Sequence, residues 1–266
     1  MNVSIIIPIH KPNKYLLNKI LDKIKSQKFK GKIEVIKVEM GLGLAASLNY
    51  GIKKAKYPII VSLHQDCMPS SLDWLENLTK PLKSKEVVAA TSKVEMPKEL
   101  WGRFDAISKI LSVKEQKVIT PLLDEKGCAY KKSDLLKVGL FDEKNFKTAG
   151  EDFDIYIKIS KLGKIVYPDA KVIHYHSYSW KTRLRKELQL SNGFGALVRI
   201  YGKSMHGWYI GLLKSIPLLG YIFFLPSINV SRLKFLSILA LPLYLLVNFI
   251  YSYGFWKGFL MAKQTV

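Results

Sequence analysis

The stretch IEVIKVEMGLGLAASLNYGIKKAKYPIIVSLHQD, residues 33–66, decides the fold. Residues 33–38 are a short run rich in β-branched side chains, which predicts a strand. A glycine-containing turn follows, and then a helical pattern over residues 44–55. Residues 58–63 form another apolar run, which predicts a second strand. Two strands with a helix between them predict a parallel pair joined by a right-handed crossover.

The residues before this stretch extend the same alternation. VSIIIPI, residues 3–9, predicts a strand, and residues 13–27 place leucines and isoleucines on one helical face behind Asn13 as the N-cap. The whole pattern predicts an α/β fold with a doubly wound, mostly parallel sheet. Ligands bind beyond the carboxyl ends of the strands in such sheets, so we expect the loops PIHKPN, VEMGLG and HQDCMPS to meet there.

The middle of the chain continues the pattern less regularly. Residues 97–125 give no clear assignment. Elsewhere we predict a helix at 71–82, a strand at 87–94, a strand and a short helix within 127–143, a helix at 151–163 and two short strands within 164–177.

Composition narrows the class of protein. The 266 residues suffice for one large domain, or for one domain with an appendage. A hydrophobic content of 48% excludes a disordered chain. The net charge of +21 favours a polyanionic partner, such as nucleic acid, anionic lipid or a phosphorylated ligand. Two cysteines form no disulfide framework and suit a reducing compartment, and the N-terminus lacks the features of a signal peptide.

The composition changes near residue 180, which predicts a second domain at 181–266. Residues 180–190 are strongly basic, and the apolar stretch at 207–225 is interrupted by a lysine and a proline. Residues 235–256 contain no charge and are long enough to cross a hydrocarbon core of about 30 Å. We expect membrane association through residues 205–260, either as a crossing or as a helix in the interface, with a buried helix of a soluble bundle as the alternative.

The segment HQDC, residues 64–67, is an unusual combination of side chains for the end of a buried strand. It brings an imidazole, an amide, a carboxyl and a thiol together directly before Met68 and Pro69. Three interpretations compete: a metal site, a redox or nucleophilic cysteine, and a polar loop without a chemical role.

Residues 3–177 resemble a family 2 glycosyltransferase of the GT-A fold. The resemblance rests on VSIIIPIHKPNKYLLNKILDKIKSQ, on GLAASLNYGIKKAKYPIIVSLHQDCMPSSLDWLENL, and on GCAYKKSDLLKVGLFDEKNFKTAGEDFDIYIKISKLGKIVYPDAKVIHYHS, in that order along the chain. It implies an inverting enzyme that moves a sugar from a nucleotide-diphosphate donor to an acceptor hydroxyl. The chain lacks the Gln-x-x-Arg-Trp segment of processive relatives, so we expect a single transfer per acceptor.

The resemblance also implies a divalent metal at the family's acidic triplet, which here is His64-Gln65-Asp66. Asp66 keeps the position of the usual metal ligand, whereas His64 replaces the first acid and is expected to contact ribose or to be structural. His174 and His176 lie two residues apart on one face of a strand, and of these His174 is the expected second ligand. Oxygen ligands suit Mg²⁺ or Mn²⁺, and an added imidazole favours Mn²⁺.

The catalytic base is expected in the segment GEDFD, residues 150–154. By resemblance Asp152 accepts the proton of the acceptor hydroxyl, and Glu151 positions the acceptor or Asp152. Adjacent carboxylates repel, which can raise the pKa of one of them. An acidic first turn that serves only the helix dipole is the alternative, and it describes Asp154 best.

The nucleotide-sugar pocket is expected at the ends of the first strands. Two departures from the family leave the base undefined: Met40 stands where a second acid is usual, and Leu48 stands where an arginine often precedes Asn49. The residues implied for binding the nucleotide sugar are Pro8, Ile9, His10, Glu39, Asn49, His64, Gln65, Asp66, Cys128 and Ala129.

These features predict a metal-dependent glycosyltransferase on the cytoplasmic face of the cell membrane. Its acceptor is expected to be lipid-linked, in the synthesis of a cell-surface glycan or glycolipid. An inactive, glycosyltransferase-like membrane scaffold is the alternative, because the triplet is altered. A nucleic-acid-binding protein is disfavoured because no recognition motif accompanies the scattered lysines, and a nucleotidyltransferase because PIHKPN contains no glycine.

Overall fold

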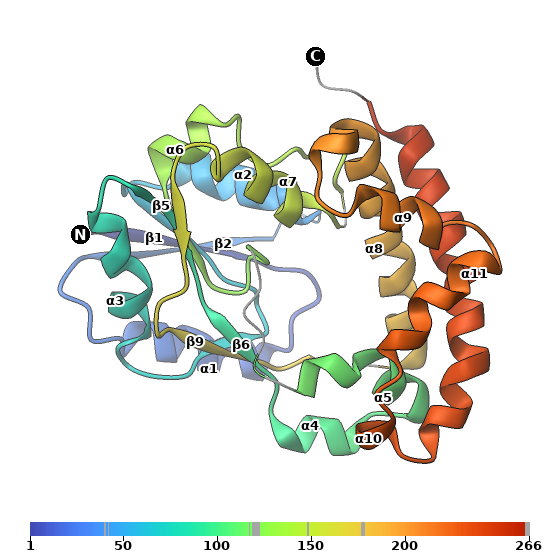
Figure 1. Ribbon diagram of the computed structural model, residues 1–266. Helices are drawn as coiled ribbons and strands as arrows, with labels where there is room; N and C mark the ends of the chain where they lie inside the picture. The colour runs from blue at the N-terminus through green and yellow to red at the C-terminus, as the bar shows by residue number, and fades with distance from the viewer. Residues whose placement is uncertain are drawn as a thin grey trace. The chain divides into compact units, whose positions relative to one another are not determined.

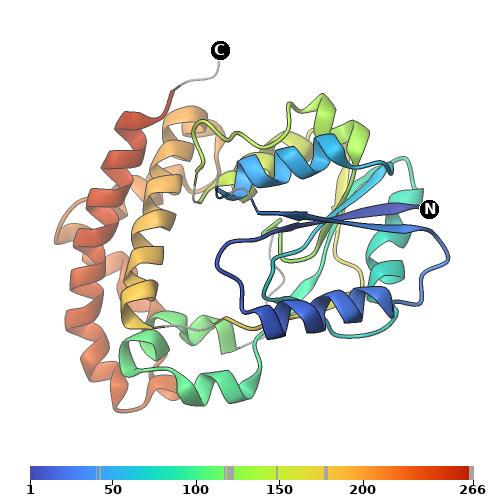
Figure 2. The same ribbon diagram turned by 180° about the vertical axis from the view of Figure 1, so that it is seen from behind.

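The structure is a computed structural model that divides into two compact units (Figure 1, Figure 2). It describes residues 1–39, 41, 43–116, 118, 123–147, 149–176 and 179–263. The first unit comprises Met1–Pro97, Lys117–Glu143 and Glu151–His176, and the second comprises Lys98–Gln116, Lys144–Gly150 and Ser177–Val266. The largest segment of the second unit begins near the predicted boundary at residue 180, and two earlier segments join it.

The first unit contains a six-stranded sheet in the order β2-β1-β3-β7-β5-β8. Its strands are β1 (Val3–Pro8), β2 (Ile33–Val38), β3 (Ile59–Ser62), β5 (Val87–Thr91), β7 (Cys128–Lys131) and β8 (Lys164–Val166). Strand β1 pairs in parallel with both β2 and β3, and β5 pairs in parallel with β8. The predicted α/β fold with a mostly parallel sheet is confirmed.

Strand β7 is antiparallel to both of its neighbours, β3 and β5. Its first residue, Cys128, lies opposite Ser62, the last residue of β3, and opposite Thr91, the last residue of β5. The residues that lead into β7 therefore lie beside the residues that leave β3, at the edge of the sheet where a ligand site is expected.

A second, three-stranded sheet has the order β4-β9-β6. Its strands are β4 (Cys67–Pro69), β6 (Lys93–Glu95) and β9 (Lys171–His174). We expected residues 64–70 to form a loop, but β4 pairs antiparallel with β9, with Cys67 opposite His174. Three residues are too few to show a strand period in sequence, so this pairing was not predictable from the local pattern.

Helices cover both faces of the large sheet, and Figure 2 shows α1 below it and α2 above it. They are α1 (Lys14–Lys25), α2 (Leu44–Lys54), α3 (Trp74–Thr79) with the 3₁₀ turn η1 (Lys80–Lys83), α6 (Lys132–Lys137) and α7 (Glu151–Ile159). Alternate residues of β1 point to opposite faces, so Ile5 packs with Ile20 of α1 and Ile6 packs with Ile52 of α2. The predicted cap is confirmed: Asn13 Oδ1 accepts a hydrogen bond from the backbone N–H of Leu16 at 3.1 Å.

The second unit is helical in the part of it that the structure describes. Its helices are α4 (Lys98–Arg103), α5 (Ala106–Ser112), α8 (Trp180–Tyr201), α9 (Trp208–Lys214), α10 (Val230–Leu233) and α11 (Leu236–Met261), with 3₁₀ turns η2 (Val113–Gln116), η3 (Gly202–Ser204) and η4 (Leu219–Ser227).

Helices α8 and α11 pack closely through small residues. A Cβ atom on Gly195 of α8 would lie 2.0 Å from the carbonyl oxygen of Phe255, and one on Gly258 of α11 would lie 1.9 Å from that of Asn192. Either substitution would force the helices apart, so the glycines are needed for the close approach of the two backbones.

Among the single helices in the described ranges, α11 alone is long and apolar enough to cross a membrane. Helices α9 and η4 pass the same test only as a pair that is bent by 113°. About a third of the apolar window of α11 is buried within the protein.

Candidate active site

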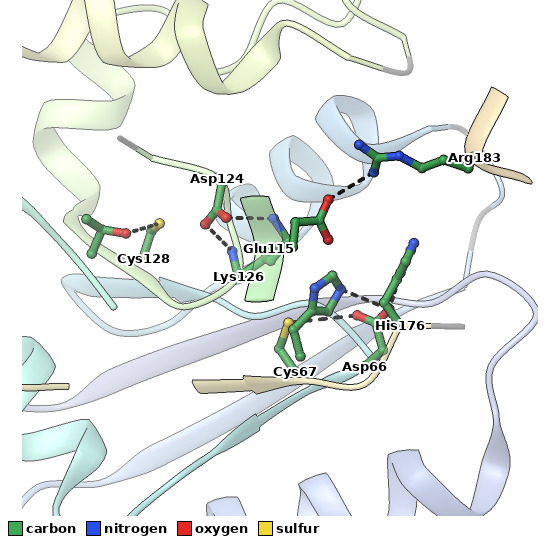
Figure 3. Close-up of polar contacts among 10 residues, drawn as sticks. Asp66, Cys67, Glu115, Asp124, Lys126, Cys128, His176 and Arg183 are labelled. Atoms are coloured by element: carbon green, nitrogen blue, oxygen red, sulfur yellow. Dashed lines mark hydrogen bonds and ion pairs between the residues drawn. The ribbon is translucent and has the colours of Figure 1, made fainter. Parts of the chain in front are cut away.

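The centre of the candidate site is the side chain of Asp66, between β3 and β4 (Figure 3). Its Oδ2 atom lies 3.4 Å from His174 Nε2 and 3.4 Å from His176 Nδ1. The backbone N–H of Tyr175 donates to the carbonyl oxygen of Asp66 at 2.8 Å, which extends the β4–β9 pairing past His174. The backbone thus holds one carboxylate against two imidazoles from another strand.

Asp66 is ionised in this setting. Burial opposes ionisation, but hydrogen bonds from His174 and His176 and the charge interaction with His174 outweigh it and hold the pKa of Asp66 well below its usual range. The carboxylate is therefore charged at neutral pH and available to a cation.

The Asp66–His174–His176 cluster fits a divalent metal ion. One ligand atom from each residue lies within 4.8 Å of the others. Two ligands about 2.1 Å from one ion lie about 3.0 Å apart at a right angle and about 3.4 Å apart at the tetrahedral angle. The observed separations of 3.4 Å match this range. A carboxylate with two imidazoles suits Mn²⁺ better than Mg²⁺, which prefers oxygen alone.

His64 and Cys67 flank Asp66 and could form a competing metal cluster with it. Burial lowers the pKa of His64 to about 4 against the opposing charge of Asp66, so its ring is neutral at pH 7. Its Nε2 atom is buried and has no hydrogen-bond partner among the described residues. Burial raises the pKa of Cys67 well above its usual range, which disfavours a thiolate nucleophile or ligand.

The loops after β1 and β3 are clamped together, as the sheet topology predicts. The backbone N–H of His10 donates to Gln65 Oε1 at 2.8 Å, and Gln65 Nε2 donates to the carbonyl oxygen of His10 at 2.7 Å. Pro8 ends β1, and Ile9 is buried and donates its N–H to the carbonyl oxygen of Val38 at 2.8 Å. The exposed side chain of His10 is accessible to a nucleotide, whereas Ile9 is buried and could contact one only through its backbone.

Glu39 and Asn49 are two further positions expected at the nucleotide-sugar pocket. Glu39 is exposed directly after β2, and Met40 lies outside the described residues. Asn49 is buried in α2, where its Nδ2 donates to the carbonyl oxygen of Phe141 at 2.8 Å and its Oδ1 accepts from the N–H of Phe141 at 3.0 Å. The amide of Asn49 thus fastens the chain that leads towards α7, and a contact with nucleotide stays a prediction.

Cys128 and Ala129 are completely buried at the start of β7. The thiol of Cys128 lies 3.2 Å from Thr91 Oγ1, and burial raises its pKa well above the usual range. With both side chains enclosed, only the backbone near this strand end could approach a donor sugar, as the resemblance implies.

Asp152 lies in the first turn of α7 and is partly exposed. Its Oδ1 accepts a hydrogen bond from the backbone N–H of Phe153 at 2.9 Å. Burial raises its pKa above the usual value, against the smaller opposing effect of that hydrogen bond. Glu151 beside it is buried. Asp154 instead forms an ion pair with Lys158 at 2.9 Å within the helix, which matches the structural role expected of it.

Sequence reasoning missed three ionisable side chains just before β7. Asp124 pairs with Lys126 through Oδ2 and Nζ at 2.6 Å. Glu125 between them is fully buried in a left-handed conformation with φ at 59°, and accepts a hydrogen bond from the hydroxyl of Tyr130. Burial raises the pKa of Glu125 to about 8, so this carboxyl is protonated at neutral pH. No local signal marked these residues, because Asp124 and Glu125 end the segment that gave no clear assignment and Lys126 directly follows it.

Residues 17–135 match the family described as "Glycosyl transferase family 2". No curated protein matches the chain. Among solved structures, the mannosyltransferase PcManGT from Pyrobaculum calidifontis, in complex with GDP-Man and Mn²⁺, is 20% identical; the alignment covers 91% of this chain and 74% of that one, with a TM-score of 0.56. GalNAc-T7, with UDP, GalNAc and Mn²⁺, is 17% identical over 90% of this chain and 54% of that one, with a TM-score of 0.52.

At these identities the solved structures show a shared fold, the GT-A fold. The family match includes Asp66 and Lys126 and ends before Glu151 and Asp152. The resemblance to family 2 glycosyltransferases of the GT-A fold is confirmed by these two findings together.

Proposed function

We propose that this chain, whose residues 17–135 match the family described as "Glycosyl transferase family 2", transfers a sugar with inversion from a nucleotide-diphosphate donor to an acceptor hydroxyl. The observation that carries the proposal is the cluster of Asp66, His174 and His176 at the carboxyl end of β3. The two solved relatives contain a nucleotide or nucleotide sugar together with Mn²⁺, which supports the same ligand classes here.

The proposed metal is Mn²⁺, held by Asp66, His174 and His176. When bound, a divalent cation supplies Lewis acidity to the diphosphate oxygens. His10 and Gln65 fix the neighbouring loop, where the base and ribose are proposed to bind with Pro8, Ile9, Glu39 and His64. The ring of His64 is neutral and adds no charge that would compete with the metal.

The proposed reaction is a direct displacement at the anomeric carbon. The acceptor oxygen forms a bond to the anomeric carbon while the bond from that carbon to the diphosphate oxygen breaks. The electron pair of the broken bond leaves with the nucleoside diphosphate. Asp152 takes the proton of the acceptor hydroxyl, and Glu151 is proposed to hold Asp152 or the acceptor in place. The raised pKa of Asp152 makes its carboxylate a stronger base than an exposed aspartate.

Calorimetry with UDP, GDP and dTDP, each with and without Mn²⁺, tests this function. We expect one nucleotide to bind much more tightly with Mn²⁺ than without, because the cluster and the diphosphate share the ion. That result also identifies the nucleotide of the donor. If none of the three binds with Mn²⁺ present, the transferase proposal fails and the inactive scaffold replaces it.

We further propose that the second unit binds the cytoplasmic membrane surface and that the acceptor is lipid-linked. One face of α11 is buried through residues such as Tyr244 and Phe255, whereas the other is apolar and exposed. The most exposed apolar side chains of this helix and its start are Phe235 at 79%, Ile238 at 75%, Leu260 at 78% and Met261 at 69%. Basic residues of α8 add attraction for anionic lipid.

The packing of α11 favours a helix in the interface over a crossing. Leu184 of α8 packs with the apolar cluster that contains Tyr244, near the middle of α11. A crossing would therefore bring Lys181 and Arg185 of α8 towards the centre of the bilayer, which is costly for charged side chains. A helix lying in the interface keeps them at the level of the lipid headgroups.

Co-sedimentation with phosphatidylcholine vesicles containing phosphatidylglycerol tests the membrane proposal. The double variant Phe235→Glu/Ile238→Glu is expected to bind at least about tenfold more weakly, because two buried apolar contacts with lipid are lost. The control Tyr15→Glu changes a side chain that is 70% exposed on α1, and should bind like the unmodified protein. Equal binding of all three proteins would contradict the proposal, as would full solubility without affinity for vesicles.

A further inference from the structure

The ion pair of Asp124 and Lys126 lies in the segment that leads into β7 (Figure 3). Asp124 holds Lys126 twice: Oδ2 accepts from Nζ at 2.6 Å, and Oδ1 accepts from the backbone N–H at 3.2 Å. The side chains are 16% and 18% exposed, so this pair is enclosed, unlike most surface lysines. A lysine held so firmly presents its ammonium in a fixed place.

The strand register shows where that place is. Ser62 lies opposite Cys128 in the antiparallel pair of β3 and β7. Lys126 precedes Cys128 by two residues and His64 follows Ser62 by two, so both leave the sheet at the same end. The charge of Lys126 also acts on the pKa values of His64, Cys67 and Asp152. The ammonium thus lies near the segment that carries Asp66 and near Asp152.

A positively charged side chain near Asp66 could stabilise the negative charge of the donor phosphates. The triplet contributes a single carboxylate, that of Asp66, because its other two residues are a histidine and a glutamine. A nucleotide-sugar donor carries negative charge on both phosphates, and the nucleoside diphosphate gains more as it leaves. A fixed ammonium in an enclosed site stabilises such a developing charge without reorganising.

We infer that Lys126 is a diphosphate-binding residue. Its ammonium contacts the phosphate oxygens of the bound donor and keeps this contact while the bond to the sugar breaks. The inference rests on the proposed function, because it assumes that a nucleoside diphosphate binds at the Asp66 cluster. An ammonium carries three N–H donors, so Lys126 can bind Asp124 and a phosphate oxygen at once. Asp124 is then a positioning residue that orients Lys126 without touching the donor.

The test is calorimetric titration in saturating Mn²⁺ with UDP, GDP and dTDP, and with uridine, guanosine and thymidine, on the full chain. Lys126→Met is expected to bind the diphosphate about 10- to 100-fold more weakly, as for a lost charge-assisted hydrogen bond, with unchanged affinity for the nucleoside. Lys126→Arg should restore most of the affinity, because it returns the charge. A thermal melt of Lys126→Met and of a second variant, Lys126→Gln, checks that both are folded.

Lys164→Met is the matched control. Lys164 pairs with Glu86 at 2.7 Å, so the control also breaks a lysine–carboxylate pair, but Lys164 begins β8 at the opposite edge of the sheet. It should bind every nucleotide like the unmodified protein.

The outcomes separate the two proposals. If the unmodified protein binds one of the three diphosphates and the folded Lys126→Met and Lys126→Gln variants bind it equally well, the inference is overturned and the proposed function stands. If the variants lose affinity for nucleoside and diphosphate alike, the role is not specific to phosphate and the inference is also overturned. If the unmodified protein binds none of UDP, GDP and dTDP with Mn²⁺, the proposed function fails, and the inference fails with it.

Discussion

Asp152→Asn is expected to lower the turnover number by about 100- to 10,000-fold while nucleotide binding stays at its original affinity. An amide cannot accept the proton of the acceptor hydroxyl, but its oxygen can still accept the hydrogen bond from the N–H of Phe153. The variant should therefore keep the helix start and the metal cluster intact. Turnover is measured as nucleoside diphosphate released from the donor that calorimetry identifies.

The pH profile supplies a second signature of Asp152. A general base works only when deprotonated, so turnover should rise with pH through the pKa of Asp152, which burial places above the usual value of 3.8. Asp152→Asn should lack this rise.

Asp154→Asn is the control for Asp152. It removes the ion pair with Lys158, four residues further along α7, so it should lower the melting temperature and keep the rise in turnover with pH. Turnover of Asp152→Asn within tenfold of the original would show that another group takes the proton.

The parts of the fold set by local sequence were predictable. Residues 33–38 form β2 as expected, and Asn13 caps α1, because strand period and capping chemistry act over a few residues. Ligands were expected beyond the carboxyl ends of parallel strands, and the His10–Gln65 clamp lies there. These features need no knowledge of distant pairing.

The parts that depend on distant pairing were not predictable. Strand β4 exists because it pairs with β9, about a hundred residues later in the chain. That pairing, continued by Tyr175, places His176 beside Asp66, although its spacing of two residues from His174 was visible in the sequence. Lys126 gains its place from the antiparallel direction of β7, which the alternating pattern of strands and helices did not show.

Asp66→Ala is expected to abolish Mn²⁺-dependent nucleotide binding and to reduce turnover by at least about 1,000-fold, since the site loses its one charged metal ligand. The fold should survive, because the backbone of residue 66, not its side chain, accepts the hydrogen bond from Tyr175. Calorimetry of the favoured nucleotide, repeated over a series of Mn²⁺ concentrations, measures the loss. Binding that still requires Mn²⁺ in this variant would place the ion elsewhere.

A pair of single variants then decides which neighbours of Asp66 complete the metal site. If His174 and His176 are ligands, His176→Ala should weaken Mn²⁺ binding by about 100-fold, whereas Cys67→Ser should leave it unchanged. If the competing cluster with His64 and Cys67 holds the ion, the order reverses. The buried, protonated thiol of Cys67 argues for the first outcome, because a metal prefers the thiolate and burial makes that form costly here. The neutral imidazoles of His174 and His176 can bind a metal ion without losing a proton. They therefore complete a site beside the ionised Asp66 at a lower free-energy cost than the thiol of Cys67.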